Sequence, residues 1–426
     1  MTIQFYKETN FKETPIGEIP KDWKVVRLAE IAKDFYYGIT ARATANKTKL
    51  RMLRTTDIKN YCVNWDDLPF CEITEKRRNM TKYLLMKDDI IIARAGTTGV
   101  SVLVDKKLDN VIFGSYLIKV RLKNNAYPKF MHYFLQSHLY WKHITSSQAG
   151  STLKNISLPV LKSLKIPLPT IQEQQKIAEI LSTVDEAIHK TNEIIAKAKR
   201  LKKGLMQELL TKGIGHKEFK DTEIGRIPKE WEVVKLGNAL ELCQYGLSIP
   251  MSDKGKYPII RMDEIVNGYV IPKISKFVDL DEKTFKTFKL EKGDILFNRT
   301  NAYELVGRTG IFLLNGNYVF ASYLIRLRPK REIFDPHFLT YYLIFSHNRL
   351  KQLATKAVHQ ANINARNLKK VKIPKPSLVE QQKIASILST IDKKLEIERK
   401  EKEKLERIKQ GLMDLLLTGK IRVKVN

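Results

Sequence analysis

The sequence has only three cysteines in 426 residues, Cys62, Cys71 and Cys243, and no two of them have C-x-x-C spacing. This argues against a disulfide framework and a cysteine-type zinc site. Wholly apolar runs such as Ile90–Ala93 are far shorter than the ~20 residues of a membrane span. The N-terminal residues MTIQFYKETNFKE do not have the pattern of a signal peptide. We therefore expect a cytoplasmic protein with no membrane partner.

Acidic residues are also scarce. The chain has 76 lysines and arginines against 46 aspartates and glutamates, a formal net charge of +30. Residues 14–170 hold 26 basic and 13 acidic residues, and residues 222–377 hold 26 and 15. A composition of 43% hydrophobic and 29% charged residues is typical of a globular protein, here of about two to four domains. So basic a chain favours a polyanionic partner, nucleic acid before a membrane surface.

The sequence repeats itself with an offset of about 207 residues. Residues 16–28 (IGEIPKDWKVVRL) share nine of 13 positions with 224–236 (IGRIPKEWEVVKL). Residues 166–185 (IPLPTIQEQQKIAEILSTVD) share 14 of 20 with 373–392 (IPKPSLVEQQKIASILSTID). Weaker matches lie between these blocks in the same order, including a recurring F-x-S-Y string that begins at Phe113 and Phe320. A period this long indicates duplication of a whole domain and not a solenoid.

The first part of each repeat mixes short apolar runs with Gly- and Asn-rich turns. We expect strands over 89–93, 111–120, 294–297 and 318–327, and helices near 129–142 and 336–351. This pattern predicts a compact α+β or mostly-β domain.

The second part of each repeat predicts one long helix. Both helices begin with the S/T-x-x-E pattern of a capping box and stop at a glycine: Thr170, Glu173 and Gly213 in the first copy, Ser377, Glu380 and Gly419 in the second. Apolar residues recur between these signals at spacings of three and four, and a helix of about 40 residues is ~60 Å long. A helix with a single apolar stripe needs a partner, and the simplest partner for each is the other.

The length of the linker predicts the direction of the second helix. About ten linker residues reach at most ~35 Å, less than the helix length, so the second helix has to run back along the first. The predicted fold is α+β, with two duplicated globular domains separated by two long antiparallel helices that form a coiled-coil spacer with pseudo-twofold symmetry. We expect an N-terminal extension (1–13), a first globular domain (14–170), a first helix (171–213), a linker (214–221), a second globular domain (222–377), a second helix (378–420) and a C-terminal tail (421–426).

The doubled IP-x-P…EQQKIA-x-ILS-x-x-D block resembles the specificity (S) subunit of type I restriction-modification systems, and so does the doubled IG-x-IP-x-x-W-x-V-x-x-L string. The resemblance covers about residues 11–420 in the family's order. It implies that each globular domain is a target recognition domain that reads one half of a bipartite sequence in double-stranded DNA. It also implies that the helices set the gap and dock two modification (methyltransferase) subunits, through which restriction (translocase-nuclease) subunits join.

The resemblance implies no catalytic residue, no metal and no cofactor in this chain, with S-adenosylmethionine, ATP and Mg on the partner subunits. The sequence has no phosphate-binding loop with its lysine and no G-x-G-x-x-G. The nearest approach to the Asn/Asp-Pro-Pro-aromatic motif of adenine methyltransferases is 335–338 (DPHF). It aligns with 127–130 (YPKF), so a helix start is the better interpretation.

DNA contacts are expected from short polar loops that differ between the repeats, because two half-sites usually differ. Phosphates would be contacted by Lys, Arg and backbone amides, and bases by Arg, Lys, Asn and Gln. The candidates come from the loops 36–49 with 245–256, 94–98 with 299–303, and 150–155 with 358–362. Arg54 and its counterpart Arg261 are added to them. They are Tyr36, Tyr37, Arg42, Lys47, Lys49, Arg54, Arg94, Thr97, Thr98, Ser151, Lys154, Asn155, Tyr245, Lys254, Lys256, Arg261, Arg299, Asn301, Tyr303, His359, Gln360 and Asn362.

Arg94 and Arg299 follow a buried-looking strand at matched positions, where each would either anchor a phosphate or pair with an acid of the scaffold. In the shared EQQK string, Glu173 and Glu380 are interpreted as helix caps. The remaining polar residues of that string are the candidate docking residues for the modification subunits: Gln174, Gln175, Lys176, Gln381, Gln382 and Lys383.

Two other functions stay open at this point. One is a self-contained DNA methyltransferase or nuclease with degenerate motifs, which methyl transfer by the purified chain alone would favour. The other is a coiled-coil adaptor that bridges proteins, which weak and salt-insensitive DNA binding would favour. The sequence does not reveal which bases are read.

Overall fold

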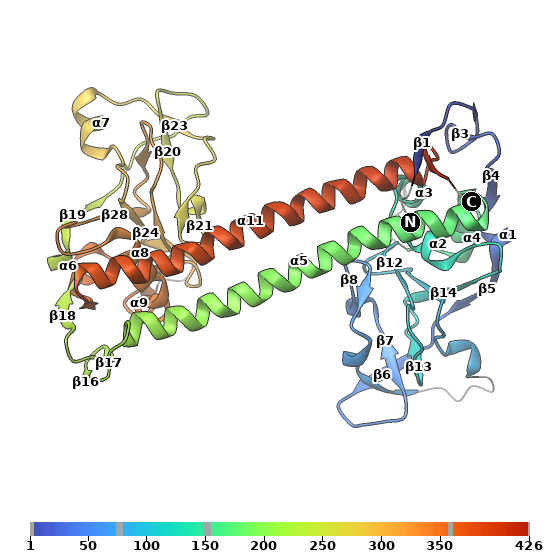
Figure 1. The fold of residues 1–426 in the computed structure, drawn as a ribbon, viewed down its shortest axis with the longest axis horizontal. Helices are drawn as coiled ribbons and strands as arrows, with labels where there is room; N and C mark the ends of the chain where they lie inside the picture. Colours follow the sequence, from blue (N-terminus) through green and yellow to red (C-terminus); the bar gives the residue numbers. More distant parts are fainter. Residues whose placement is uncertain (1–3, 74–79, 148–154, 357–360, 425–426) are drawn as a thin grey trace. The chain divides into compact units, whose positions relative to one another are not determined.

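The structure is a computed structural model of the chain and describes residues 4–73, 80–147, 155–356 and 361–424. The chain forms two compact units: unit 1 comprises Met1–Asn192 and Lys400–Asn426, and unit 2 comprises Glu193–Arg399. Each unit therefore contains one globular part and one end of each long helix, α5 (Ile171–Lys212) and α11 (Leu378–Leu416) (Figure 1).

In its described residues, unit 1 has two four-stranded sheets, four two-stranded pairs and four short helices. Its elements are β1 (Phe5–Lys7), β2 (Phe11–Lys12), β3 (Ile19–Pro20), β4 (Lys24–Arg27), α1 (Leu28–Ile31), β5 (Ala32–Tyr37), β6 (Ala41–Thr44), β7 (Arg51–Leu53), β8 (Ile58–Lys59), β9 (Cys62–Val63), β10 (Phe70–Ile73), β11 (Ile90–Ala93), β12 (Ser101–Leu103), β13 (Val111–Phe113), β14 (Leu117–Leu122), α2 (Pro128–Phe134), α3 (His138–Ser147), α4 (Leu158–Lys162), β15 (Lys165–Leu168) and β32 (Ile421–Val423).

Unit 2 repeats this order with local additions. Its elements are β16 (Phe219–Thr222), β17 (Gly225–Pro228), β18 (Glu232–Lys235), α6 (Leu236–Ala239), β19 (Leu240–Tyr245), β20 (Tyr257–Ile260), β21 (Ile265–Val266), β22 (Tyr269–Val270), β23 (Phe277–Val278), α7 (Glu282–Phe288), β24 (Ile295–Asn298), β25 (Thr300–Asn301), β26 (Thr309–Ile311), β27 (Val319–Phe320), β28 (Leu324–Pro329), α8 (Pro336–Phe345), α9 (His347–Lys351), β29 (Thr355–Lys356), β30 (Ala361–Asn362), α10 (Ala365–Lys370) and β31 (Lys372–Lys375).

The sheets confirm the duplication. Unit 1 has an antiparallel sheet in the order β12-β11-β14-β5, and unit 2 has the matching order β26-β24-β28-β19. In each unit one parallel pair lies outside this sheet, β7 with β13 and β20 with β27. A two-stranded pair, β4 with β15 and β18 with β31, joins the start of each globular part to the strand that leads into the long helix.

Four of the predicted elements are each divided in two, namely the strands 111–120 and 318–327 and the helices 129–142 and 336–351. The expected strand 111–120 divides after Phe113, because residues 114–117 form a turn in which the N–H of Leu117 donates to the carbonyl of Gly114. The expected helix 129–142 divides into α2 and α3, since the N–H of Gln136 and Ser137 make tight turn bonds to Tyr133 and Phe134.

In both units the two long helices run in opposite directions. In unit 1, Ile177 and Leu181 from the start of α5 share a core with Leu416 from the end of α11. In unit 2, Leu209 from the end of α5 shares a core with Ile384 from the start of α11. This is the predicted antiparallel pairing, and it is set by the apolar stripe. No helix among the described residues is long and apolar enough to cross a membrane.

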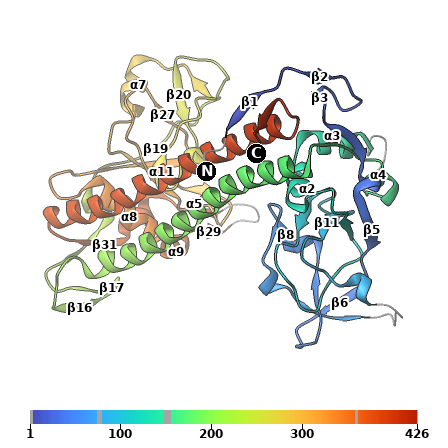
Figure 2. The ribbon, with the colours of Figure 1, turned by 45° about the vertical axis from the view of Figure 1, so that its right-hand side comes forward.

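The chain ends differ from the prediction. Helix α11 ends at Leu416, not at residue 420, and the predicted tail contains β32. This strand pairs antiparallel with β1 of the N-terminal extension, with Phe5 opposite Val423 (Figure 2). Both terminal segments therefore belong to the fold of unit 1.

Each unit buries a charged cluster beneath its main sheet. In unit 1, the carboxylate of Asp89 accepts from Arg121 Nε at 2.7 Å and lies 3.9 Å from Lys119 Nζ. Both Asp89 and Lys119 are almost fully buried. Unit 2 has the same arrangement of Asp294 with Arg328 and Arg326. The lysine of unit 1 thus has an arginine as its counterpart in unit 2.

Because of this difference, Lys119 should give unit 1 a titration in mildly alkaline solution. Burial lowers the pKa of Lys119 to about 8, below its ordinary value of ~10.4. Between these values the unfolded chain binds more protons than the folded one, so the free energy of unfolding rises with pH. From about pH 8 to about pH 10, we expect unit 1 of the wild type to gain stability relative to Lys119→Arg. Hydrogen exchange of unit 1 measures this, and equal pH slopes in both proteins would contradict it.

Candidate nucleic-acid interface

The matched arginines predicted from the sequence lie on tyrosine rings. Arg94 follows β11, and its guanidinium carbon lies 4.8 Å from the centre of the Tyr37 ring at the end of β5. Arg299 follows β24 and lies 4.7 Å from the ring of Tyr245 at the end of β19. Arginine stacks readily on aromatic faces, and such a stack restricts where its guanidinium can point.

Three loops hold the arginine of unit 1. Its backbone N–H donates to the carbonyl of Tyr116 at 2.8 Å, and its own carbonyl accepts from Ile156 at 2.9 Å. The hydroxyl of Tyr37 accepts from the N–H of Leu158 at 3.2 Å. Arg94 is therefore fixed between the loop that follows β13 and the segment that leads into α4.

Unit 2 repeats this construction. The N–H of Arg299 donates to Tyr323 at 3.0 Å and its carbonyl accepts from Ile363 at 2.9 Å. The hydroxyl of Tyr245 accepts from the N–H of Ala365 at 2.7 Å. We refer to Tyr37, Arg94 and Tyr116, and to Tyr245, Arg299 and Tyr323, as the Tyr–Arg–Tyr clusters of the two units.

The tyrosines of both clusters are exposed. Tyr116 is 64% exposed and Tyr323 44%, and Tyr37 and Tyr245 are also exposed. The Nε atoms of both arginines are buried and find no acceptor in the part of the chain that the structure describes. Tyr116 and Tyr323 were not among the predicted contacts, although the recurring F-x-S-Y string contains them. The sequence repeat aligns Tyr116 with Tyr323, but only the fold brings each of them next to an arginine.

In unit 2 a small sheet adjoins the cluster. Strands β25, β30 and β29 join two of the predicted stretches, which are about 60 residues apart in the sequence. Arg299 Nη2 donates to Asn362 Oδ1 at 3.2 Å, and Asn362 Nδ2 donates to Thr300 Oγ1 at 3.0 Å. The predicted residues Arg299 and Asn362 therefore do lie together.

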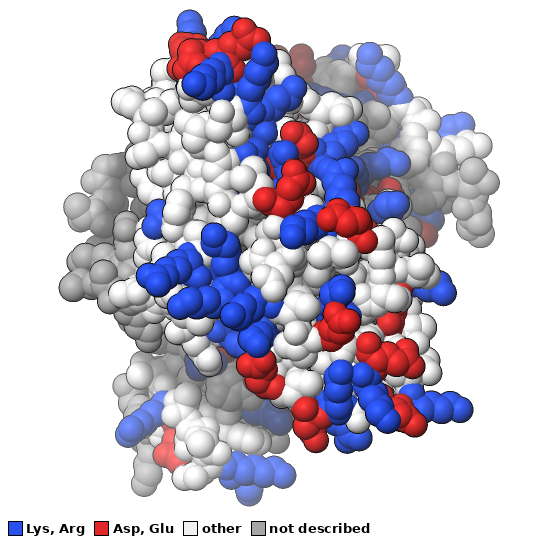
Figure 3. Space-filling model, turned by 90° about the vertical axis from the view of Figure 1, so that its left-hand side faces the viewer, with Lys and Arg blue, Asp and Glu red and all other residues white. Residues whose placement is uncertain are grey.

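Other predicted DNA contacts lie on the surface, away from these bonds. Arg42 is on β6, and Lys47 and Lys49 follow it; all three are exposed, as are Lys254 and Lys256 in unit 2. In the remaining stretches, Thr97 and Asn155 are exposed and Thr98 is half-buried. Figure 3 shows basic side chains in clusters on one face of unit 2, with acidic side chains among them.

Four further predicted contacts also touch other residues of the chain. Arg54 donates to both carboxylate oxygens of Asp57, at 3.0 and 2.7 Å, and Arg261 donates to Ser275 at 3.2 Å and to Asp263 at the limit of hydrogen-bonding distance. Tyr36 lies under the buried Lys119, and Tyr303 packs against the core of unit 2. Ser151, Lys154, His359, Gln360 and the side chain of Asn301 lie outside the described residues.

The docking prediction is wrong for two glutamines. Gln174 and Gln381 are fully buried. The side chain of Gln174 accepts from Tyr127 N and donates to the carbonyls of Asn125 and Pro169, and Gln381 makes the equivalent bonds in unit 2. These amides satisfy backbone groups where the long helix meets the globular part, so a partner subunit cannot reach them.

The other docking candidates are accessible. Gln175, Gln382 and Lys383 are exposed, and Lys176 is half-buried in an ion pair with Glu179 at 2.7 Å. These residues lie in the first turns of α5 and α11, at matched positions of the two units.

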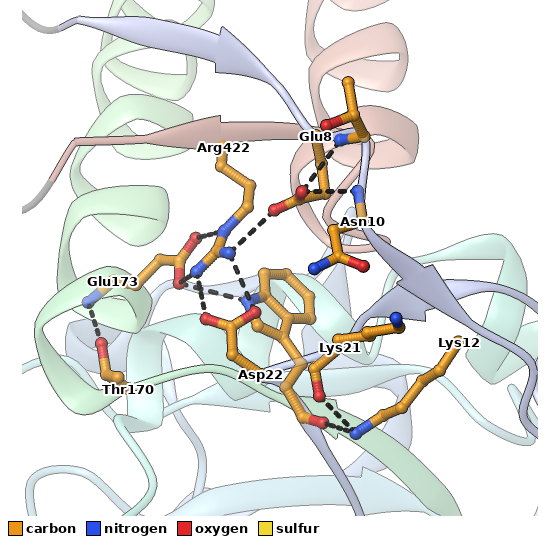
Figure 4. A network of polar contacts seen from close by, with 10 residues as sticks. Glu8, Asn10, Lys12, Lys21, Asp22, Thr170, Glu173 and Arg422 are labelled. Atoms are coloured by element: carbon orange, nitrogen blue, oxygen red, sulfur yellow. Dashed lines mark hydrogen bonds and ion pairs between the residues drawn. The ribbon is translucent and has the colours of Figure 1, made fainter.

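Glu173 and Glu380 are not reciprocal capping-box residues. Their backbone N–H groups do donate to the predicted caps, at 3.3 Å to Thr170 Oγ1 and to Ser377 Oγ. The carboxylate of Glu173, however, accepts from Trp23 Nε1 at 3.2 Å and from Arg422 at 2.8 and 2.9 Å (Figure 4).

Unit 2 uses a histidine in the same place. The carboxylate of Glu380 accepts from Trp231 Nε1 at 2.9 Å and contacts His216 Nε2 at 2.9 Å. His216 and Arg422 each stand three residues after Gly213 or Gly419, the glycine that follows the C-terminal end of the other long helix. In each unit the start of one helix is thus tied to the end of the other.

No group of three His, Cys, Asp or Glu side chains among the described residues could hold a metal ion. The chemistry that the geometry offers is hydrogen bonding and cation contact from exposed loops.

Comparison with known proteins gives consistent matches. The family model described as "Type I restriction modification DNA specificity domain" matches residues 20–200 and 228–407. The chain is 35% identical over 439 residues to the putative type I restriction enzyme MjaX specificity subunit of Methanocaldococcus jannaschii, covering 99% of both chains. It is 32% identical to the MjaVIII specificity subunit of the same organism, over 99% of this chain and 98% of the relative. The solved S subunit from M. genitalium shares the fold, with a TM-score of 0.58 at 18% identity over 92% of this chain and 96% of that chain.

Proposed function

The chain belongs to the type I restriction modification DNA specificity domain family, and on this premise we propose that it is the non-catalytic specificity subunit of a type I restriction-modification enzyme. Each unit reads one half of a bipartite sequence in double-stranded DNA, and the long helices set the gap between the halves. Methyl transfer and cleavage, with S-adenosylmethionine, ATP and Mg, take place on partner subunits.

One observation carries this proposal. Both units present the same exposed Tyr–Arg–Tyr cluster, while the loops around it differ in sequence. A cluster common to both units beside loops that differ is what we expect of two domains that bind the same DNA backbone but recognise different bases. The formal charge of +30 supports a polyanionic ligand.

Selection of bound sequences from a random duplex-DNA library tests the proposal, with the chain co-expressed with its modification subunit. The expected result is a split motif with a fixed unread gap. Salt-dependent binding without any motif would overturn it, because basic domains that only grip the backbone select no sequence.

Arg94 and Arg299 are proposed as phosphate anchors. Replacing Arg94 by alanine should weaken binding to all DNA sequences and flatten the plot of log affinity against log salt by about one unit, and the double variant with Arg299→Ala by about two. Lys106→Ala is the matched control, since it removes a charge that already pairs with Asp66. An unchanged slope in the arginine variants would assign these residues to the fold.

Two modification subunits are proposed to dock at the matched first turns of α5 and α11. Charge reversal by Lys176→Glu or Lys383→Glu should lower co-purification of the modification subunit by roughly tenfold or more, because like charges placed against each other in an interface cost several kcal/mol. Lys212→Glu, at the other end of α5, is the control and should leave assembly intact. Unaltered co-purification of the first two variants would reject this docking site.

A further inference from the structure

Among the residues that the structure describes, the side chains of Tyr116 and Tyr323 make no hydrogen bond. Only their backbone carbonyls bond to the arginines, while the rings are 64% and 44% exposed. Large exposed aromatic side chains at matched positions of two divergent domains indicate a contact surface. In the recurring F-x-S-Y string each tyrosine follows Ser115 or Ser322. It directly precedes β14 or β28, the strand that pairs with β11 or β24.

We propose that Tyr116 and Tyr323 are sequence-independent DNA contacts, whose hydroxyls donate to backbone phosphates while their rings pack on the adjacent sugars. The inference rests on the proposed function and deepens it: the clusters bind the DNA backbone, and the loops that differ between the units recognise the bases. Tyrosine is among the residues that hydrogen-bond to phosphates, and such contacts fix register without carrying sequence information.

The proposed phosphate-binding residues are bonded to one another and lie next to loops that differ between the units. Arg94 and Tyr116 are joined by a backbone hydrogen bond, so the phosphate-binding groups of one unit move together. Arg299 is joined in the same way to Tyr323, and also to Asn362 beside the β25–β30–β29 sheet. In unit 2 the proposed phosphate-binding arginine is therefore bonded directly to a loop whose sequence differs from the matching loop of unit 1. Asn362, which makes this bond, acts as a positioning residue.

The two kinds of contact differ in charge, and this gives them different signatures. An arginine that neutralises a phosphate releases counterions, so its loss flattens the salt dependence. A neutral tyrosine releases none, so its loss weakens binding at every salt concentration and leaves the slope unchanged. A side chain that only supports the fold would lower stability instead.

The test measures duplex binding by the full chain with its modification subunit, for Tyr116→Phe, Tyr323→Phe and the double variant. We expect each single variant to lose roughly threefold to tenfold in affinity, equally on the selected sequence and on unrelated DNA, with an unchanged salt slope and melting temperature. The control is Tyr318→Phe, a half-buried tyrosine of unit 2 outside the cluster.

Three results would overturn the inference: wild-type affinity of the double variant, a loss confined to the selected sequence, or a loss accompanied by a lower melting temperature. The proposed function fails separately. The wild type could select no split motif while the tyrosine variants still weaken binding. In that case the tyrosine contacts with the DNA backbone are supported, and recognition of a bipartite sequence is rejected.

Discussion

Replacing Arg422 by alanine is expected to destabilise unit 1 by about 3–5 kcal/mol. The guanidinium contacts three carboxylates, those of Glu8, Asp22 and Glu173, at 2.8 to 2.9 Å (Figure 4). Glu173 is 1% exposed, so removing the arginine leaves a buried carboxylate whose one remaining side-chain donor, among the described residues, is the indole of Trp23. An uncompensated buried charge of this kind is among the most costly single changes.

The free energy of unfolding is measured by chemical denaturation monitored by hydrogen exchange, because hydrogen exchange reports on unit 1 and unit 2 separately. Arg422→Lys should recover only part of the loss, because an ammonium group cannot form the forked contacts of a guanidinium. The matched variant His216→Ala should cost less and act on unit 2, since Glu380 keeps bonds from Trp231 and from the N–H of Ile214. A loss below about 1 kcal/mol for Arg422→Ala, the scale of an exposed ion pair, would contradict this account.

The second large effect is expected at Asp89. Its carboxylate is fully buried and accepts from Arg121 and from the N–H of Met86, next to the buried ammonium of Lys119. Asp89→Ala strands that ammonium among the carbonyls of Lys82 and Leu84. We expect a loss of about 3–5 kcal/mol in unit 1, measured as for Arg422.

A double variant separates charge from packing at this site. Combining Asp89→Ala with Lys119→Met removes the two fully buried charges and leaves only the half-buried Arg121 of this cluster, so most of the stability should return if the stranded ammonium is the cause. Asp294→Ala repeats the experiment in unit 2, where Arg326 is the stranded group. A double variant no more stable than Asp89→Ala alone would attribute the loss to the cavity.

The fold was largely predictable because the strongest signals are local. The capping Thr170 and Ser377, the apolar spacing and the repeated strings define both long helices within a few residues. The terminal segments were missed, since the pairing of β1 with β32 joins residues about 415 positions apart and has no local signal.

The candidate site was only partly predictable. Arg94 and Arg299 could be singled out because both follow an apolar strand, but their stacking on Tyr37 and Tyr245 depends on how β5 and β19 pair with β14 and β28. The same polar EQQK string contains a buried glutamine and an exposed one. Helical geometry turns successive residues by about 100°, so only the packing partner decides which of them is covered.

The sequence by itself determined the duplication, the two long helices, their opposite directions and the basic character of both globular parts. These features follow from composition, periodicity and chain length, which act over short stretches or over the whole chain. Only the tertiary structure decided which polar residues are available for binding. Gln174 and Glu173 satisfy groups within the fold, whereas Tyr116 and Tyr323 remain exposed, and this division arises from contacts between segments that are far apart in the sequence.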